Sequence, residues 1–264
     1  MKNSSKDIRD YVKGYGIHLK SWNSSLHAES VMEQIFDILY PRRCPVCDEI
    51  VTPFGQKICR RCEDKPQYAD GITCLKCGKP MKDAAAEYCV DCVRLKHVYD
   101  RGYALFRYRS ISGSIYRFKY MGRQEYADYY ADQMVKRMGK MLQNLHPDAL
   151  IPVPMYAEKE NQRGYNQAQV LALAIGKRLG IPVETNMICR IRNTVPMKKL
   201  DEVQRRNNLK RAFNIARNDV KLLTIIVIDD IYTTGSTADE IAREFRKHGT
   251  EKIYFLSLAI GQTT

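Results

Sequence analysis

The chain has 264 residues, 44% of them hydrophobic, and a formal net charge of +13. This length is enough for one domain of about 150–200 residues and a smaller module. No stretch approaches the ~18 consecutive apolar residues of a membrane span, and the start of the chain lacks the apolar segment of a secretory signal. We therefore expect a cytoplasmic protein without a membrane span. Its positive charge favours polyanionic ligands such as nucleic acid or phosphorylated metabolites, although basic residues can also serve solubility alone.

The N-terminal part is predicted to contain a polar extension, a short helix and a metal-binding module. Residues 31–40 have the apolar spacing of a helix, which Pro41 ends. Residues 42–93 contain eight of the nine cysteines. We predict a polar N-terminal extension over 1–30, a helix with a double four-cysteine zinc module over 31–93, and a second domain over 94–264.

The eight cysteines form four C-x-x-C pairs that start 15 residues apart. Two cysteines separated by two residues can direct both sulfurs at one tetrahedral zinc ion, and two such pairs complete a site. Disulfides are the alternative, and they are rare in a cytosolic chain. We predict two structural zinc sites that supply most of the folding energy of this short, polar segment. The predicted ligands are Cys44, Cys47, Cys59, Cys62, Cys74, Cys77, Cys89 and Cys92.

Two ways of sharing the zinc ions between the pairs remain open. The first pair can join the second and the third pair the fourth, or the pairs can interleave, because all three gaps have the same length. The sequential arrangement is preferred because each half of the segment then begins with a knuckle-like C-P-x-C or C-x-x-C-G. Cys189 stands alone and is interpreted as a small buried hydrophobe rather than a nucleophile.

From residue 102 onward, short apolar segments alternate with amphipathic helical patterns. This alternation predicts an α/β fold, in which a parallel sheet is flanked by helices and preceded by the small cysteine module. The expected strands are 102–108, 149–154, 222–228 and 252–259. The expected helices are one that contains Ile115 and Phe118, then 124–144, 166–179 and 237–248.

The stretch I-I-V-I-D-D-I-Y-T-T-G-S-T, residues 225–237, places two acids after an aliphatic run. In an open α/β sheet, ligands bind beyond the C-terminal ends of the strands, where we expect Asp229 and Asp230. Their carboxylates can accept hydrogen bonds from the vicinal hydroxyls of a ribose. The turn that follows offers N–H groups, hydroxyls and a helix N-terminus to a phosphate monoester. The alternative is an acidic turn with a capping box, Thr237-x-x-Glu240.

This stretch resembles the phosphoribosyl-pyrophosphate signature of type I phosphoribosyltransferases, and other motifs narrow the resemblance to the ComF family. They occur in the family's order and cover about residues 31–260. The motifs are C-P-V-C at 44–47, I-P-V-P at 151–154, R-G-Y-N-Q-A at 163–168, R-I-R-N-T at 190–194, R-R-N-N-L at 205–209 and A-F at 212–213.

The resemblance implies a type I phosphoribosyltransferase-like fold that binds phosphoribosyl pyrophosphate with Mg²⁺. Asp229 and Asp230 would hold the ribose hydroxyls. Lys159 and Arg163, in the loop after Pro154, would face the pyrophosphate, and residues 190–211 would form a mobile flap. Mg²⁺ would bridge pyrophosphate and ribose oxygens, mostly through ligand and water. The implied 5′-phosphate site consists of Thr233, Thr234, Gly235, Ser236 and Thr237.

Two functions are compatible with these residues. The first is phosphoribosyl transfer, with pyrophosphate as leaving group and an unidentified acceptor, linked to competence and DNA uptake. The second is a non-catalytic competence factor that binds single-stranded DNA and uses the phosphoribosyl site as a ligand sensor. The arginines beside the first cysteines, and tyrosines amid arginines at 103–130, suit single-stranded DNA. Packing in a core is the alternative for Tyr103, Tyr108, Tyr116 and Tyr120.

Overall fold

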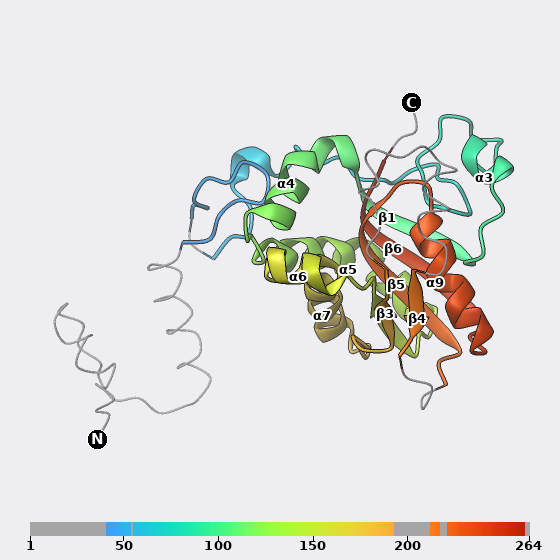
Figure 1. The fold of residues 1–264 in the computed structure, drawn as a ribbon. Coiled ribbons are helices and arrows are strands. Elements are labelled where there is room, and N and C mark those ends of the chain that lie inside the picture. Colours follow the sequence, from blue (N-terminus) through green and yellow to red (C-terminus); the bar gives the residue numbers. More distant parts are fainter. Residues whose placement is uncertain (1–40, 54, 193–211, 217–220, 262–264) are drawn as a thin grey trace, which may run out of the picture. The chain divides into compact units, whose positions relative to one another are not determined.

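The computed structural model describes residues 41–53, 55–192, 212–216 and 221–261 (Figure 1). The chain divides into two compact units, Met1–Pro41 and Arg42–Thr264, and every element described below belongs to the second. The predicted extension over 1–30 and the helix over 31–40 lie outside the described residues, and the predicted domain boundaries stay predictions. Within the described ranges, no helix is both long enough and apolar enough to cross a bilayer.

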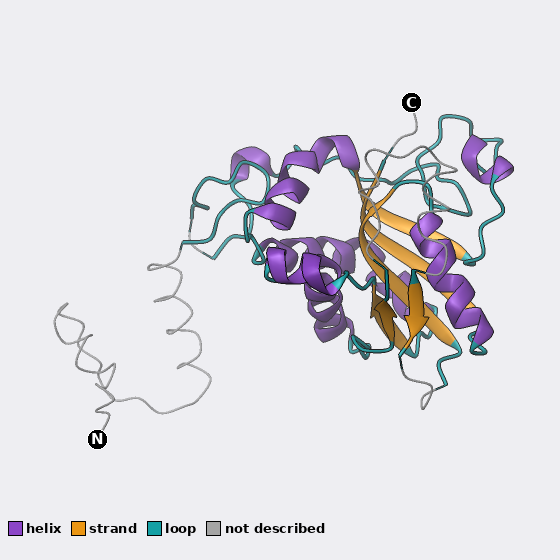
Figure 2. Cartoon of the chain, in the orientation of Figure 1, coloured by secondary structure: helices purple, strands orange, loops and turns teal. Residues whose placement is uncertain are grey.

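Four parallel strands form the central sheet, in the order β1-β6-β5-β2. The strand β5 pairs with a neighbour on each side, and its residues 225–228 are fully buried because both faces of the sheet are covered. Figure 2 shows the strands between helices, which confirms the predicted fold class. The strands are β1 (Arg101–Arg107), β2 (Ala149–Pro152), β5 (Thr224–Tyr232) and β6 (Lys252–Ile260).

The two faces of the sheet belong to two different hydrophobic cores. Ile226 and Ile228 of β5 share one core with buried residues of α4, α5 and α7, whereas Ile225 and Val227 share the other with buried residues of α9. This division follows from the two-residue period of a strand. The helices are α4 (Tyr108–Tyr120), α5 (Tyr126–Asn144), α6 (Ala157–Arg163), α7 (Gln167–Leu179) and α9 (Ser236–Lys247).

Two small cysteine ribbons precede β1 in the chain. The first ribbon (residues 42–65) contains the 3-10 helix η2 (Arg60–Cys62), and the second ribbon (residues 72–94) contains α3 (Val90–Arg94). Each ribbon has one antiparallel bridge at its start, Arg43 to Ile50 in the first and Thr73 to Pro80 in the second. The bridges are 30 residues apart, so the structure repeats with the period of the cysteine pattern.

The second ribbon packs directly against the sheet. Gly78 has a φ of +75°, and a Cβ on it would lie only 2.7 Å from the carbonyl oxygen of Gly102 in β1. The Gly102 N–H donates to the carbonyl oxygen of Lys76. Cys74 and Cys77 are buried in the hydrophobic core that lies between the sheet and α9. The second ribbon and the α/β domain therefore share one core.

A short antiparallel pair, β3 (Ile188–Arg190) and β4 (Phe213–Ile215), was not expected from the sequence. Each strand has three residues, which is too short for a pattern of alternation to be recognised. The residues 193–211 between these strands, which contain most of the expected flap, lie outside the described part of the chain.

Candidate functional site

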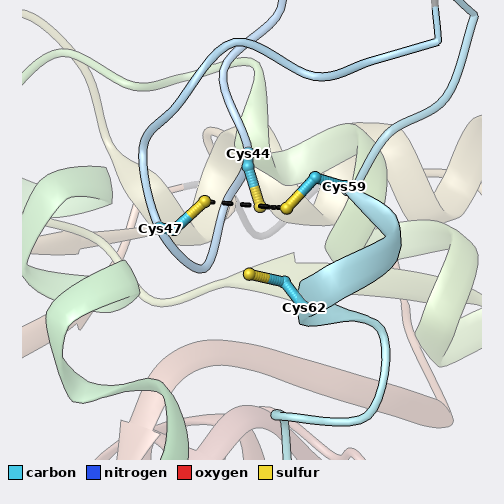
Figure 3. Close-up of side chains that lie close together, drawn as sticks. All are labelled: Cys44, Cys47, Cys59 and Cys62. Atoms are coloured by element: carbon cyan, nitrogen blue, oxygen red, sulfur yellow. Dashed lines mark hydrogen bonds between the residues drawn. The ribbon is translucent and has the colours of Figure 1, made fainter.

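The eight paired cysteines gather into two groups of four. In the first group, shown in Figure 3, the sulfurs point toward one another. Cys59 Sγ lies 3.6 Å from Cys44 Sγ and 3.7 Å from Cys47 Sγ. Sulfurs placed tetrahedrally at about 2.3 Å from zinc lie about 3.8 Å apart, so these thiols fit a zinc ion. The groups are Cys44, Cys47, Cys59 and Cys62, and Cys74, Cys77, Cys89 and Cys92.

This grouping is the sequential arrangement and not the interleaved one. All nine cysteines lie in described residues, and all are free thiols rather than disulfides. Nearby N–H groups contact the sulfurs: Arg61 Nη2 lies 3.8 Å from Cys47 Sγ, and the Cys89 N–H donates to Cys74 Sγ at 3.3 Å. Such donors stabilise thiolates that bind a metal.

The acid pair lies inside β5, near the C-terminal end of the strand. We expected the strand to end at Ile228, but its pairing with β6 continues to Tyr232. The expectation that Asp229 and Asp230 follow the strand is therefore wrong, since Asp229 lies opposite Ser257 of β6. Aspartate is uncommon in strands, and for that reason we predicted the end of the strand too early. Pairing with β6 outweighs this preference.

The two carboxylates have different surroundings because successive side chains of a strand point to opposite faces. Asp230 Oδ2 forms an ion pair with Lys119 Nζ of α4 at 2.7 Å. Asp229 instead lines a small hollow beside the start of α9. Sequence reasoning missed Lys119, because a lysine near the end of a helix gives no sign of the strand that the helix will cover.

Burial, and then the charge of Asp230, raise the pKa of Asp229 to about 8. Lys119, the Asp230 N–H and Arg190 act in the opposite direction. The Asp230 N–H donates to Asp229 Oδ1 at 2.8 Å. A carboxyl group with a pKa near neutrality responds to any charged ligand that approaches it, and this behaviour is common at binding sites.

All five residues of the hydroxyl-rich turn, Thr233 to Thr237, line the same hollow as Asp229. Gly235 has a φ of +77° and is the N-cap of α9, which has no side-chain cap. The helix begins at Ser236, so the alternative of a capping box that starts at Thr237 is wrong. A helix N-terminus without a side-chain cap leaves backbone N–H groups for an anion.

Lys159 and Arg163 lie on the helix α6, not on the loop expected after Pro154. The residues A-E-K-E-N-Q-R at 157–163 are mostly good helix formers, which explains the difference. The helix ends at Gly164, with a φ of +82°, and α7 begins after Asn166. The Asn166 side chain caps α7 and donates to the Val153 carbonyl oxygen at 3.0 Å. The R-G-Y-N motif therefore joins two helices to the end of β2.

Cations from α6 and β3 lie near one another, and Arg190 of β3 also lies near Asp229. Burial, then Arg190 and Arg163, lower the pKa of Lys159. Burial also lowers the pKa of Arg190, and the charge of Asp229 opposes that effect. The guanidinium of Arg163 lies 4.8 Å from the ring centroid of Tyr120 on α4. Because the cations repel one another, a bound polyanion would relieve the repulsion.

Cys189, next to Arg190 on β3, is only partly buried. Its Sγ lies 3.5 Å from the Asn214 carbonyl oxygen on β4. The expectation of a buried side chain is therefore wrong. The reason is that β3 belongs to a two-stranded sheet and not to the central one.

The parallel sheet and the two thiol groups define an α/β protein with a zinc module. Residues 35–93 match the family model of the double zinc ribbon domain. Competence protein F of Haemophilus influenzae is 32% identical over 228 residues, which cover 82% of this chain and 96% of that protein. The chain belongs to the ComF family of competence proteins.

Two further relatives have lower identity. Competence protein ComFC of Bacillus subtilis is 28% identical over 71% of this chain and 77% of its own length. DNA utilization protein YhgH of Salmonella typhimurium is 28% identical over 68% of this chain and 80% of its own length. All three alignments span more than two thirds of this chain.

Among solved structures, a purine phosphoribosyltransferase from Pyrococcus horikoshii aligns with a TM-score of 0.34 and 19% identity, over 50% of this chain and 74% of its own. A glutamine phosphoribosylpyrophosphate amidotransferase from Bacillus subtilis aligns with a TM-score of 0.35 and 16% identity, over 54% of this chain and 30% of its own. These scores are low, and the fold is defined by the strand order and the cysteine ribbons.

Replacement of Asp229 by Asn should change how stability depends on pH. The pKa of Asp229 in the folded protein is about 8, and in an unfolded chain it is about 3.9. Between these values the folded state binds more protons than the unfolded state, so this carboxyl lowers wild-type stability as pH rises. The unfolding temperature of Asp229→Asn, minus that of the wild type, should therefore increase from about pH 4 to pH 8 and then level off.

Thermal denaturation of the ligand-free protein measures this difference. Asp70→Asn serves as the control, because Asp70 is an exposed acid on the surface. A difference for Asp229→Asn that stays constant across the pH range would contradict the raised pKa.

Metal analysis tests the grouping of the thiols. The wild type should contain two zinc ions per chain, one for each group. The variant Cys44→Ser/Cys59→Ser removes two ligands from one group and should retain one zinc ion. In the interleaved arrangement, the same variant would damage both sites and retain none. Cys189→Ser, outside both groups, should retain two.

Proposed function

We propose that the chain binds phosphoribosyl pyrophosphate with Mg²⁺ at the C-terminal edge of its parallel sheet. The observation that carries the proposal is that Asp229 and the turn Thr233 to Thr237 line one hollow. A carboxylate suits the hydroxyls of a ribose, and a helix N-terminus without a side-chain cap suits a phosphate. Asp229 and the turn are only a few residues apart in the sequence. This closeness suits the short distance between the diol and the 5′-phosphate of one ribose.

The remaining charges fit the other end of such a ligand. Lys159, Arg163 and Arg190 supply positive charge for a pyrophosphate group. When a ligand binds, Asp230, which now forms an ion pair with Lys119, would turn to accept the second ribose hydroxyl or a metal-bound water. Mg²⁺ keeps several waters and prefers phosphate oxygens, so it would be held largely by the ligand.

In a transfer reaction, the bond between C1 of the ribose and the pyrophosphate oxygen breaks, and the electron pair leaves with pyrophosphate. The acceptor then forms its bond at the cation-like C1. Lys159, Arg163 and Arg190 would stabilise the negative charge on the leaving group, and the carboxylates would hold the ribose in position. We propose this activity as part of the role in DNA uptake that the name of the family suggests.

Equilibrium binding of phosphoribosyl pyrophosphate with Mg²⁺ tests the site. Titration calorimetry should detect binding by the wild type and a loss of about 100-fold or more in Asp229→Asn/Asp230→Asn. This magnitude applies above pH 8, where Asp229 is ionised, because each hydrogen bond to a charged group contributes about 1.5–3 kcal/mol and every 1.4 kcal/mol is about tenfold in affinity.

Asp70→Asn is the matched control, because it removes an acid far from the hollow in sequence and exposed to solvent. Absence of binding by the wild type would remove the ligand from the proposal. Unchanged binding by the double variant would show that the ribose contacts are made elsewhere.

A second candidate function, binding of single-stranded DNA, has support of its own. A large open hollow in the first ribbon is lined by Arg43, Arg60 and Arg61. On α4, Tyr116 and Tyr120 are 57% and 53% exposed, and their ring centroids lie 5.2 Å apart. Arginines that meet phosphates and tyrosines that stack on bases are the usual components of such a surface.

The four tyrosines named from the sequence thus divide into two pairs. Tyr103 and Tyr108 pack against the core beneath α4 and α5, as the core alternative expects. Tyr116 and Tyr120 are exposed and remain candidates for contact with DNA.

Affinity for an oligothymidylate, measured against salt concentration, separates the two contributions. Arg60→Gln removes one candidate phosphate contact and should reduce the slope of log affinity against log salt by about 0.7. Tyr116→Leu/Tyr120→Leu should weaken binding by about 1–3 kcal/mol per stacked base and leave the slope unchanged. Arg243→Gln, an exposed arginine on α9, is the control. Identical slopes for all variants would exclude the first ribbon as a DNA surface.

A further inference from the structure

The segment between the second ribbon and β1, residues 95–100, contacts the start of α9 through a buried hydrogen bond. The side chain of His97 is 1% exposed, and its Nδ1 lies 2.9 Å from Asp239 Oδ2. The Val98 N–H donates to the other oxygen, Oδ1, at 2.8 Å. Asp239 belongs to the first turn of α9, so its charge lies near the N-terminus that faces the hollow. Residues 97 and 98 together satisfy both oxygens of this carboxylate.

Two buried tyrosines extend the contact into a chain of hydrogen bonds. Tyr232 Oη lies 3.4 Å from His97 Nε2, and Tyr99 Oη lies 2.7 Å from Tyr232 Oη. With the ring proton of His97 on Nδ1, the imidazole donates to Asp239, Tyr232 donates to Nε2 and Tyr99 donates to Tyr232. Each donor then has one acceptor, which fixes the orientation of the imidazole ring.

The chain of hydrogen bonds lies directly against the backbone of the hydroxyl-rich turn. A Cβ placed on Gly235 would lie 2.5 Å from Tyr232 Oη and 2.7 Å from His97 Cε1. Only a glycine fits there, both for this reason and because of its positive φ. The backbone at Gly235 therefore cannot move toward His97 and Tyr232 without displacing their side chains.

The second ribbon holds this segment in place. Lys76 Nζ donates to the Tyr99 carbonyl oxygen, and the Tyr99 ring is fully buried in the core that contains Cys74 and Cys77. The first ribbon has a separate small core built around its own cysteines. Of the two ribbons, the second therefore contacts the segment that carries His97 and Tyr99.

We propose that His97 is a positioning residue for the 5′-phosphate turn, held in place by the second zinc ribbon; this inference rests on the proposed function. The residue acts in two ways. Its imidazole supports the backbone at Gly235, and its N–H offsets the charge of Asp239. Without this partner, a buried carboxylate in the first turn of α9 would oppose the negative charge of the phosphate.

Three substitutions of His97 test the two contacts separately. In His97→Leu both ring nitrogens are lost. In His97→Asn the side-chain amide takes the place of Nδ1 and can still donate to Asp239. In His97→Gln the amide takes the place of Nε2, so it reaches Tyr232 and not Asp239. Because the Asn and Gln variants are both polar and differ only in reach, their comparison stays informative even where the Leu variant does not fold.

The probes are ribose 5-phosphate, which carries the 5′-phosphate group, and Mg²⁺ pyrophosphate, which does not. We expect His97→Leu and His97→Gln to bind ribose 5-phosphate about tenfold or more weakly than the wild type, the loss expected for a hydrogen bond to a charged group. His97→Asn should recover most of that affinity. Mg²⁺ pyrophosphate should bind all four proteins equally, and each should retain two zinc ions, as the two thiol groups predict.

Each outcome decides one point. Failure of the wild type to bind ribose 5-phosphate would overturn the proposed function and this inference with it. Wild-type binding that is unchanged in His97→Leu or His97→Gln would overturn the inference alone. An equal loss for both probes would show that His97 only stabilises the fold, and equal affinities of the Asn and Gln variants would remove Asp239 from the explanation.

Discussion

The parallel pairing of β5 with β6 beyond the apolar part of the strand is the constraint on which the site depends. It holds two adjacent carboxylates in regular strand geometry near the C-terminal end of a central strand. Because neighbours on a strand face opposite ways, one acid must meet α4 and the other the hollow beside α9. Burial of the two charges then requires cations nearby, and Lys119 and Arg190 supply them. The positions of α4 and β3 relative to the strand are therefore part of the electrostatics of the site.

Much of this arrangement could be predicted from the sequence, because it is encoded in local patterns. The cysteine spacing indicated the zinc sites, and the alternation of short apolar runs with helical patterns indicated the parallel sheet. Several of the errors have a common cause. The end of β5 and the partial exposure of Cys189 depend on which strand becomes a neighbour, and the contacts of Lys119 and His97 depend on side chains more than a hundred residues away. No local pattern reports a contact of that kind.

The two ribbons attach to the rest of the chain by different physical means. The first ribbon is joined to α5 and the turn before it by charged groups. Lys57 Nζ lies 2.8 Å from Asp128 and 2.7 Å from Asp132, and Arg123 pairs with Asp48 at 3.0 Å. Such partly exposed pairs contribute little individually and weaken with salt. The second ribbon is joined by apolar burial and backbone hydrogen bonds, which salt does not screen. The same cysteine pattern, present twice, thus forms two ribbons whose interfaces with the rest of the chain differ in chemistry.

The close approach of Gly78 to Gly102 has a consequence for how the protein matures. Since the second ribbon completes the core of the sheet domain, neither part can reach its final packing before the other. Loading of the second thiol group and assembly of the α/β domain should then form a single cooperative transition, whereas the first thiol group can load independently. When zinc is scarce, the protein should therefore accumulate as incompletely folded chains rather than as folded protein that lacks one metal ion.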